Sequence, residues 1–127
     1  MRALNIAVIA VPLFLLSGLP PAQGQTNPTV QTISATEASE HVGEHVTVCG
    51  RVAARYTATT SPGTPTFVSL DRSGREAVFT ILIWRDDRSR VGHVPESGKV
   101  CATGMITAYR GTPEIVLRDS HSWFVPR

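Results

Sequence analysis

The clearest structural signal in the chain lies in residues 45–56, which read HVTVCGRVAARY. Val46, Val48 and Val52 occupy alternate positions, whereas the positions between them carry polar or small residues. Such alternation is typical of a β-strand with one buried face and one solvated face. Gly50 falls in the buried phase, where it favours a bulge or a sharp coil of the strand. We therefore predict a half-buried first strand that bends near its middle.

Four further stretches have strand character. They are rich in β-branched or aromatic residues, are separated by turn residues, and lie at residues 66–71, 77–84, 99–109 and 114–118. The one long connection, residues 85–98, falls between the third and fourth strands. This order matches the oligonucleotide/oligosaccharide-binding (OB) fold. We predict an all-β fold, a five-stranded OB-fold Greek-key barrel over residues 35–127, with a five-stranded half-sandwich as the alternative.

A short helix is predicted before the first strand. Residues 35–42 read ATEASEHV, with Ser34 or Thr36 as the N-cap and Gly43 as the stop. The long connection at residues 85–98 holds a short helix or none.

The segments together resemble a known family. The pattern V-x-V-x-G-x-V occupies residues 46–52, and F-x-x-L-D-x-x-G occupies residues 67–74. Residues 79–84 read FTILIW, and residues 98–115 read GKVCATGMITAYRGTPEI. These segments look like the small exported bacterial proteins described as OB-fold, nucleic-acid-binding-like domains, and the first two patterns are similar to the anticodon-binding OB domains of aminoacyl-tRNA synthetases. The resemblance implies an OB fold whose ligand is a single-stranded nucleic acid, a sugar or a protein.

The N-terminus has the order of a secretory signal peptide. Arg2 precedes an uncharged apolar run at residues 6–16, and small residues at Ala22 and Gly24 suit a cleavage site. The run is too short to cross a bilayer as a helix, although an uncleaved anchor is the alternative reading. We predict a signal peptide at residues 1–24, a flexible lead-in at residues 25–34, and an exported protein, periplasmic or secreted, with no stable membrane span after cleavage.

Composition narrows the classes of function. The chain has 127 residues, of which 42% are hydrophobic and 17% are charged, which excludes a disordered chain. The net charge of +2 argues against strong binding of polyanions by overall charge. However, seven arginines and four acidic residues lie between Gly50 and Gly92, which favours a modest basic face.

The two cysteines fall in equivalent places. Cys49 and Cys101 each lie in the outward phase of a predicted strand, and those strands are neighbours in an OB barrel. Facing residues of neighbouring strands are within disulfide reach, and an exported protein meets an oxidising environment. We predict a Cys49–Cys101 disulfide, with two separate thiols as the alternative. No metal site is expected, since Gly43 separates His41 from His45 and no Cys-x-x-Cys motif is present.

Candidate ligand contacts come from the ends of strands, where OB ligands bind. Arginines would contact phosphates and aromatic rings would stack on bases, and the candidates are Arg51, Arg55, Tyr56, Trp84, Arg85, Tyr109 and Arg110. Phe67 and Phe79 are expected in the core, and Trp84 has packing beneath a loop as its alternative role. Tyr109-Arg110-Gly111 also fits a plain tight hairpin, with Gly111 at positive φ.

No catalytic arrangement is apparent in the sequence. It contains no G-x-S-x-G motif and no phosphate-binding Gly loop, and its serines have no neighbouring base. We therefore expect a monomeric, non-catalytic module without a cofactor. Its expected partner is single-stranded DNA or RNA, and the alternative partner is an envelope protein or glycan.

Overall fold

The structure, a computed structural model, describes residues 10, 12, 18 and 29–127. Most of the predicted signal peptide, residues 1–24, therefore lies outside the described residues. Within the part of the chain that is described, no helix has the length and apolar character needed to cross a membrane.

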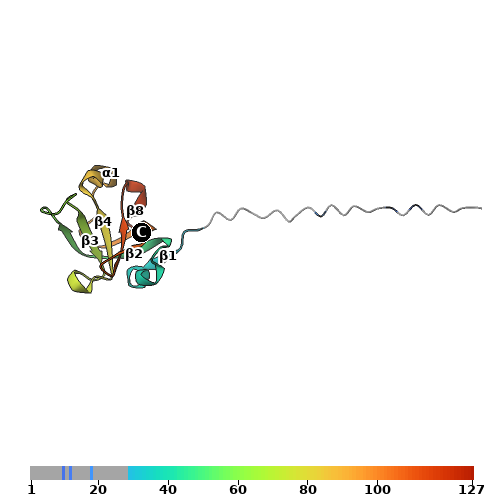
Figure 1. The fold of residues 1–127 in the computed structure, drawn as a ribbon, viewed down its shortest axis with the longest axis horizontal. Coiled ribbons are helices and arrows are strands. Elements are labelled where there is room, and N and C mark those ends of the chain that lie inside the picture. The colour runs from blue at the N-terminus through green and yellow to red at the C-terminus, as the bar shows by residue number, and fades with distance from the viewer. Residues whose placement is uncertain (1–9, 11, 13–17, 19–28) are drawn as a thin grey trace, which may run out of the picture.

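The described chain is built mainly from short strands joined by helical turns (Figure 1). The strands are β1 (Thr32–Ser34), β2 (His45–Thr57), β3 (Thr66–Leu70), β4 (Phe79–Ile83), β5 (Lys99–Met105), β6 (Thr107–Tyr109), β7 (Thr112–Val116) and β8 (Trp123–Phe124). The helical turns are η1 (Ala35–His41), η2 (Gly74–Glu76), η3 (Arg85–Asp87), α1 (Arg88–Val91) and η4 (Ser120–Ser122). The predicted all-β class is confirmed.

All eight strands belong to one mixed sheet. Their hydrogen-bonded order is β6-β7-β4-β3-β2-β5-β8, and β1 pairs with β2 beside this path. The β4–β7 and β1–β2 pairs are parallel, whereas the other pairs are antiparallel. The order is open at both ends. The prediction of a closed five-stranded barrel is therefore wrong.

The difference arises at Ile106, in the middle of one predicted strand. The N–H of Ile106 donates to the carbonyl of Glu44 (3.0 Å), and its carbonyl accepts from the N–H of Gly43 (2.8 Å). Ile106 thus bonds to the turn before β2, so β5 ends there and β6 begins with a new partner, β7. Because β5 and β6 lie toward opposite ends of the strand order but are one residue apart, the sheet curls strongly.

β2 changes partners along its length. Its first half pairs with β5 and β1, and its second half pairs with β3. The register with β3 shifts between Val52 and Ala54, as expected for a β-bulge. Near this point Gly50 is buried, and a Cβ there would lie 3.0 Å from the Cβ of Leu70 and 3.1 Å from that of Ala35. The predicted bend is confirmed, and Gly50 is required by close packing.

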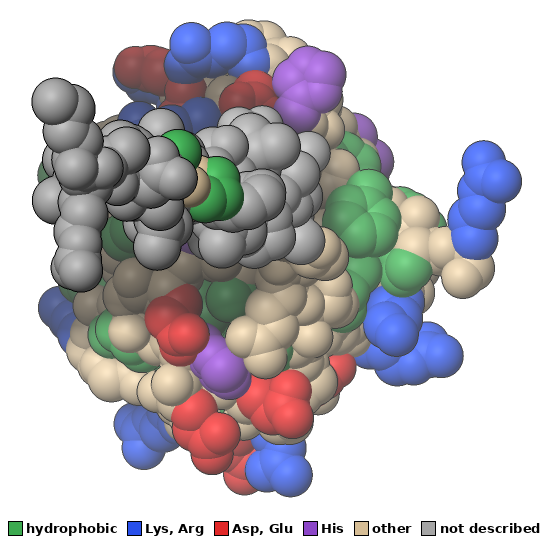
Figure 2. Space-filling model, turned by 90° about the vertical axis from the view of Figure 1, so that its right-hand side faces the viewer, with side chains coloured by type: hydrophobic (Ala, Val, Ile, Leu, Met, Phe, Trp, Pro, Cys, Tyr) green, Lys and Arg blue, Asp and Glu red, His purple; other side chains and the backbone are tan. Residues whose placement is uncertain are grey.

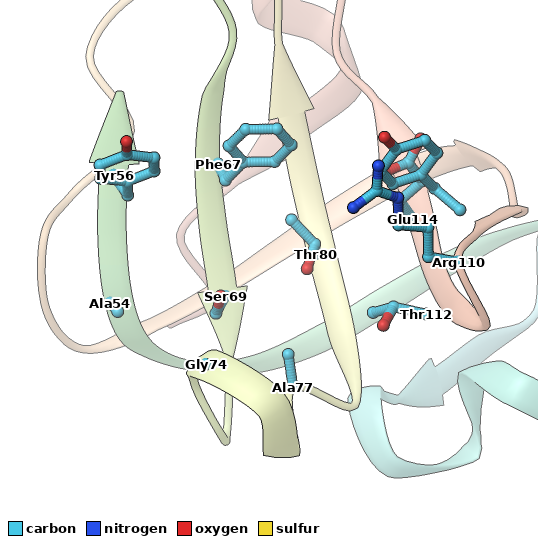
Figure 3. A pocket seen from close by; sticks show the side chains of 11 residues that line it. Ala54, Tyr56, Phe67, Ser69, Gly74, Ala77, Thr80, Arg110, Thr112 and Glu114 are labelled. Atoms are coloured by element: carbon cyan, nitrogen blue, oxygen red, sulfur yellow. The ribbon is translucent and has the colours of Figure 1, made fainter. Parts of the chain in front are cut away.

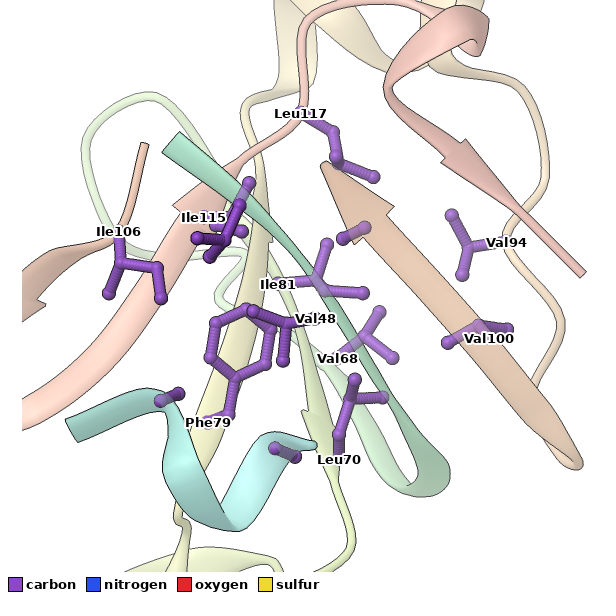
Figure 4. Close-up of a cluster of buried hydrophobic side chains, with 14 of the residues drawn as sticks. Val48, Val68, Leu70, Phe79, Ile81, Val94, Val100, Ile106, Ile115 and Leu117 are labelled. Carbon is purple, nitrogen blue, oxygen red and sulfur yellow. The ribbon is translucent and has the colours of Figure 1, made fainter. Parts of the chain in front are cut away.

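The core fills the inside of the curled sheet (Figure 4). Val48, Val68, Leu70, Phe79 and Ile81 are all fully buried and come from β2, β3 and β4. The expectation that Phe79 belongs to the core is confirmed. Burial of a side chain of this size stabilises the fold by about 1.5–3 kcal/mol.

The N-terminal elements close one end of this core. The last three residues of the expected lead-in form β1, because Ile33 is buried there beside β2. The predicted helix is the 3-10 turn η1, and the Ser34 N–H donates to the Glu37 carboxylate (3.0 Å), which lowers the pKa of Glu37. Figure 1 shows η1 and α1 at opposite ends of the sheet.

The predicted disulfide is present. Cys49 and Cys101 are direct partners in the β2–β5 register, with Cα atoms 4.1 Å apart. The bond joins positions 52 residues apart in the chain. Closing a loop of that length stabilises the folded state by about 4 kcal/mol in the chain-entropy model.

We therefore predict that replacing both cysteines (Cys49→Ser with Cys101→Ser) lowers the free energy of unfolding by about 4 kcal/mol, because the unfolded chain regains its entropy. Denaturant unfolding of the oxidised wild type and the double variant checks this. The reduced wild type is the control and should unfold near the variant. Equal midpoints for all three proteins would contradict the prediction.

Candidate functional site

Two adjoining hollows form a groove on the outer face of the sheet, and Figure 3 shows the first of them. The first has a volume of about 410 Å³ and the second about 340 Å³. The first hollow is lined by Ala54, Tyr56, Phe67, Ser69, Gly74, Ala77, Thr80, Tyr109, Arg110, Thr112 and Glu114. The second is lined by Ser61, Pro62, Pro65, Phe67, Leu82, Trp84, Tyr109 and Glu114. Phe67, Tyr109 and Glu114 line both hollows, so we treat the two as one groove.

One row of paired residues crosses the groove floor from β2 to β4. Tyr56 pairs with Phe67, and Phe67 pairs with Leu82. Side chains alternate along a strand, so the residues next to these, such as Val68 and Ile81, point into the core. Phe67 is half-buried in the groove floor, so the expectation that it belongs to the core is wrong.

A second, more polar row runs beside the first. Ser69 pairs with Thr80, and Thr80 pairs with Glu114 of β7. Glu114 also pairs with Thr107 of β6. Hydroxyl groups and one carboxylate thus lie next to the aromatic row. Glu114 was expected from the sequence only as a partner of Arg110 and was not among the predicted ligand contacts, although its phase, opposite to buried Ile115, was a usable signal.

Three exposed aromatic residues from different elements stand around Phe67. Tyr56 is 65% exposed, Tyr109 55% and Trp84 37%, which is high for side chains of this size. Three of the predicted candidates, Tyr56, Trp84 and Tyr109, are therefore brought together with Phe67.

Trp84 also supports the loop that joins β2 to β3. A Cβ on Gly63 would lie 2.9 Å from the Trp84 ring, so the ring packs on the bare backbone of Gly63. The N–H of Arg85 donates to the Gly63 carbonyl (3.1 Å), and the Arg88 guanidinium donates to the Thr64 carbonyl. The ring therefore packs beneath a loop, as the alternative role expected, and it also lines the second hollow, where contact with a ligand stays a prediction.

The hairpin between β6 and β7 places the groove's one arginine. Arg110 and Gly111 both have positive φ (49° and 82°), as a two-residue hairpin turn requires. The Arg110 guanidinium lies over the Tyr109 ring, 5.3 Å from its centroid, within the range of a cation–π contact. Figure 3 shows Arg110 and Glu114 on the same side of the groove. None of the ion pairs in the described residues joins them.

Glu114 is the carboxylate of the groove. It is half-buried, and burial raises the pKa of its carboxyl group above the ordinary value.

The remaining predicted arginines lie outside both hollows. Arg55 donates to the carbonyl of Val94 (2.7 Å), because the bulge in β2 turns it away from the groove. Arg85 is exposed and pairs with Asp86 (3.4 Å), and Arg51 is exposed beside Lys99 in the β2–β5 register. On the face in Figure 2, basic side chains are spread around the margin and form no single patch.

Comparison with known proteins finds a distant structural match. No protein-family model and no curated protein matches this chain. A solved structure assigned as an aspartyl-tRNA synthetase from Leishmania major Friedlin is 16% identical, with a TM-score of 0.49. The match covers 80% of this chain and 22% of that protein, so this chain spans about a fifth of its length. The chemical class of the ligand therefore has to be inferred from the residues that line the groove.

The Gly63–Trp84 contact leads to a prediction. Gly63→Ala should lower the free energy of unfolding by about 1–3 kcal/mol, because the added methyl group collides with the Trp84 ring and the positive φ (74°) disfavours Ala. The collision should also shift the tryptophan emission, because the ring has to move. Fluorescence and denaturant unfolding provide the measurements.

Gly98→Ala is the matched control, since Gly98 also has positive φ (82°) but has nothing within 4 Å of the added Cβ. Its free energy of unfolding should fall only because Ala disfavours the positive φ, and its tryptophan emission should stay unchanged. Identical spectra for the two variants would contradict the packing of Trp84 on Gly63.

Proposed function

We propose that this chain is an exported, non-catalytic OB-like module that binds single-stranded nucleic acid in the groove. One observation carries the proposal: Tyr56, Phe67, Trp84 and Tyr109 line a single open groove, with Arg110 at its side. Single strands bind by stacking bases on aromatic rings and by pairing phosphates with basic side chains. Each stacked base contributes about 1–3 kcal/mol, so a groove with several rings needs few charges.

The position of the groove supports an OB-like mode of binding. In an OB fold, the ligand lies across the face of the second and third strands. It lies beneath two loops, one between the first and second strands and one between the fourth and fifth strands. The groove lies on β3 and β4, between the β2–β3 loop (Ser61, Pro62 and Pro65) and the β6–β7 hairpin. Arg85 is exposed and follows Trp84 in the chain, and we propose it as a further phosphate contact for a strand that leaves the second hollow.

The chemistry of the lining favours binding over catalysis. The lining residues offer aromatic rings, hydroxyl groups, one guanidinium and one carboxylate. An activated hydroxyl nucleophile needs a base in hydrogen-bond contact with it, and among the side-chain hydrogen bonds of the described residues none joins the Glu114 carboxylate to a hydroxyl group. We therefore assign the groove to recognition.

Export is supported by two independent features. The predicted signal peptide at residues 1–24 directs the chain out of the cytoplasm. The Cys49–Cys101 bond is the kind of cross-link that persists in an oxidising compartment.

A glycan is the second candidate ligand, and Glu114 is the observation that favours it. A carboxylate beside hydroxyl groups and aromatic rings suits the hydroxyl groups of a sugar, and OB folds also bind oligosaccharides. A single lining arginine is fewer than a long polyanion would use.

Titration with single-stranded oligonucleotides, duplex DNA and oligosaccharides at two salt concentrations separates these candidates. For the nucleic acid, we expect log K to fall with log salt at a slope of about −1 to −2, from about two phosphate contacts. Tyr109→Ala should weaken binding about tenfold, because one stacked base is lost. Tryptophan fluorescence or calorimetry gives the affinities.

Phe124→Ala is the control, because Phe124 is an exposed aromatic residue (48%) on β8 that lines neither hollow. Its affinity should equal that of the wild type. Salt-independent binding of an oligosaccharide, with no binding of oligonucleotides, would replace the first candidate with the second.

A further inference from the structure

Glu114 belongs to the lining that the two hollows of the groove share. It lines both hollows, and its strand partners on either side are Thr80 and Thr107, which carry no charge. Any strand long enough to occupy both hollows therefore passes this carboxylate. Among the ion pairs of the described residues, none involves Glu114.

The charged and titratable groups that face Glu114 are few. Besides Glu114, the residues of the two hollows that have a charged or titratable side chain are Arg110, Tyr56 and Tyr109. Arg110 stacks on Tyr109, and Glu114 and Arg110 are the acidic and the basic side chain of the lining. The β3 and β4 residues of the lining, such as Phe67 and Thr80, do not titrate. The net charge of the groove is thus set by Glu114 and Arg110 and depends on whether Glu114 is protonated.

An ionised Glu114 opposes a phosphodiester ligand. Like charges in a partly dehydrated site repel more strongly than they do in water. Protonation removes the repulsion, leaves Arg110 as the groove's net charge, and turns the carboxylate into a hydrogen-bond donor.

We propose that Glu114 gates the groove, which binds a polyanionic single strand more tightly when Glu114 is protonated, so that binding is coupled to proton uptake. This inference rests on the proposed function and adds its regulation.

The direction of the effect follows from linkage. Burial already raises the pKa of Glu114, so the group takes up a proton at a higher pH than an exposed glutamate does. A phosphate nearby raises that pKa further, because it disfavours the charged form. The bound state then holds more protons than the free state, and affinity increases as pH falls through this range.

The test compares the wild type with Glu114→Gln, in which the amide mimics the neutral acid. Binding of single-stranded oligothymidylate is measured at about pH 8 and about pH 5 at constant salt. The wild type should bind about threefold to tenfold more tightly at the lower pH. Glu114→Gln should bind at both values about as tightly as the wild type does under acid conditions.

Glu96→Gln is the matched control, since Glu96 is exposed in the connection before β5 and lines neither hollow. It should keep the pH dependence of the wild type, which excludes the change in overall charge as the explanation. Loss of the pH dependence in Glu114→Gln excludes the histidines, because that variant keeps all of them. Calorimetry in buffers of different ionisation enthalpy should show proton uptake by the wild type and none by Glu114→Gln.

Each other outcome overturns the proposal in a recognisable way. Weaker binding by Glu114→Gln at both pH values would mean that the carboxylate accepts hydrogen bonds from the ligand. An unchanged pH dependence in Glu114→Gln would place the titrating group elsewhere. In both cases the nucleic-acid function stands. If neither protein binds the oligonucleotide at either pH, the proposed function fails as well.

Discussion

The register shift in β2 between Val52 and Ala54 sets the face of the sheet to which each later side chain of β2 points. Before the shift, even-numbered residues such as Val48 point into the core. After it, Ala54 and Tyr56 line the groove, and Arg55 points the other way, toward the carbonyl of Val94. Without the extra residue, Tyr56 would compete for space in the core, and the groove would lose one of its rings.

The same bend explains why one strand can serve two parts of the sheet. β2 runs beside β5 and β1 in its first half and beside β3 in its second half. Close contact at Gly50, where a Cβ would meet Leu70 and Ala35, lets the strand turn without opening the core. The groove therefore depends on a glycine that lies on the opposite side of the sheet.

Local pattern predicted the parts of the fold that local chemistry controls. Alternating residues predicted β2, runs of β-branched and aromatic residues between turns predicted β3 and β4, and the outward phases of Cys49 and Cys101 predicted the disulfide. The end of β5 could not be read in this way, since it depends on backbone bonds between Ile106 and the distant turn at Gly43. β8 is only two residues long, which is too short for a periodic signal.

The sequence predicted the aromatic residues that line the groove better than it predicted the charged ones. Tyr56, Trp84 and Tyr109 end strands or enter hairpins, and such positions are recognisable in a sequence. The direction of a long arginine side chain depends on a bulge or on an acceptor far away in the chain, as Arg55 demonstrates. Glu114 resembles an ordinary strand residue until the parallel pairing of β7 with β4 places it beside Thr80.

The pairing of Cys49 with Cys101 has a consequence for how the protein matures. A slip of one residue between β2 and β5 would turn the two sulfur atoms to opposite faces of the sheet. The bond therefore closes in the β2–β5 alignment that places Cys49 opposite Cys101, and a slip of one residue prevents it. Oxidation would then select molecules in which β2 and β5 are correctly aligned, and chains whose strands are one residue out of register would keep free thiols.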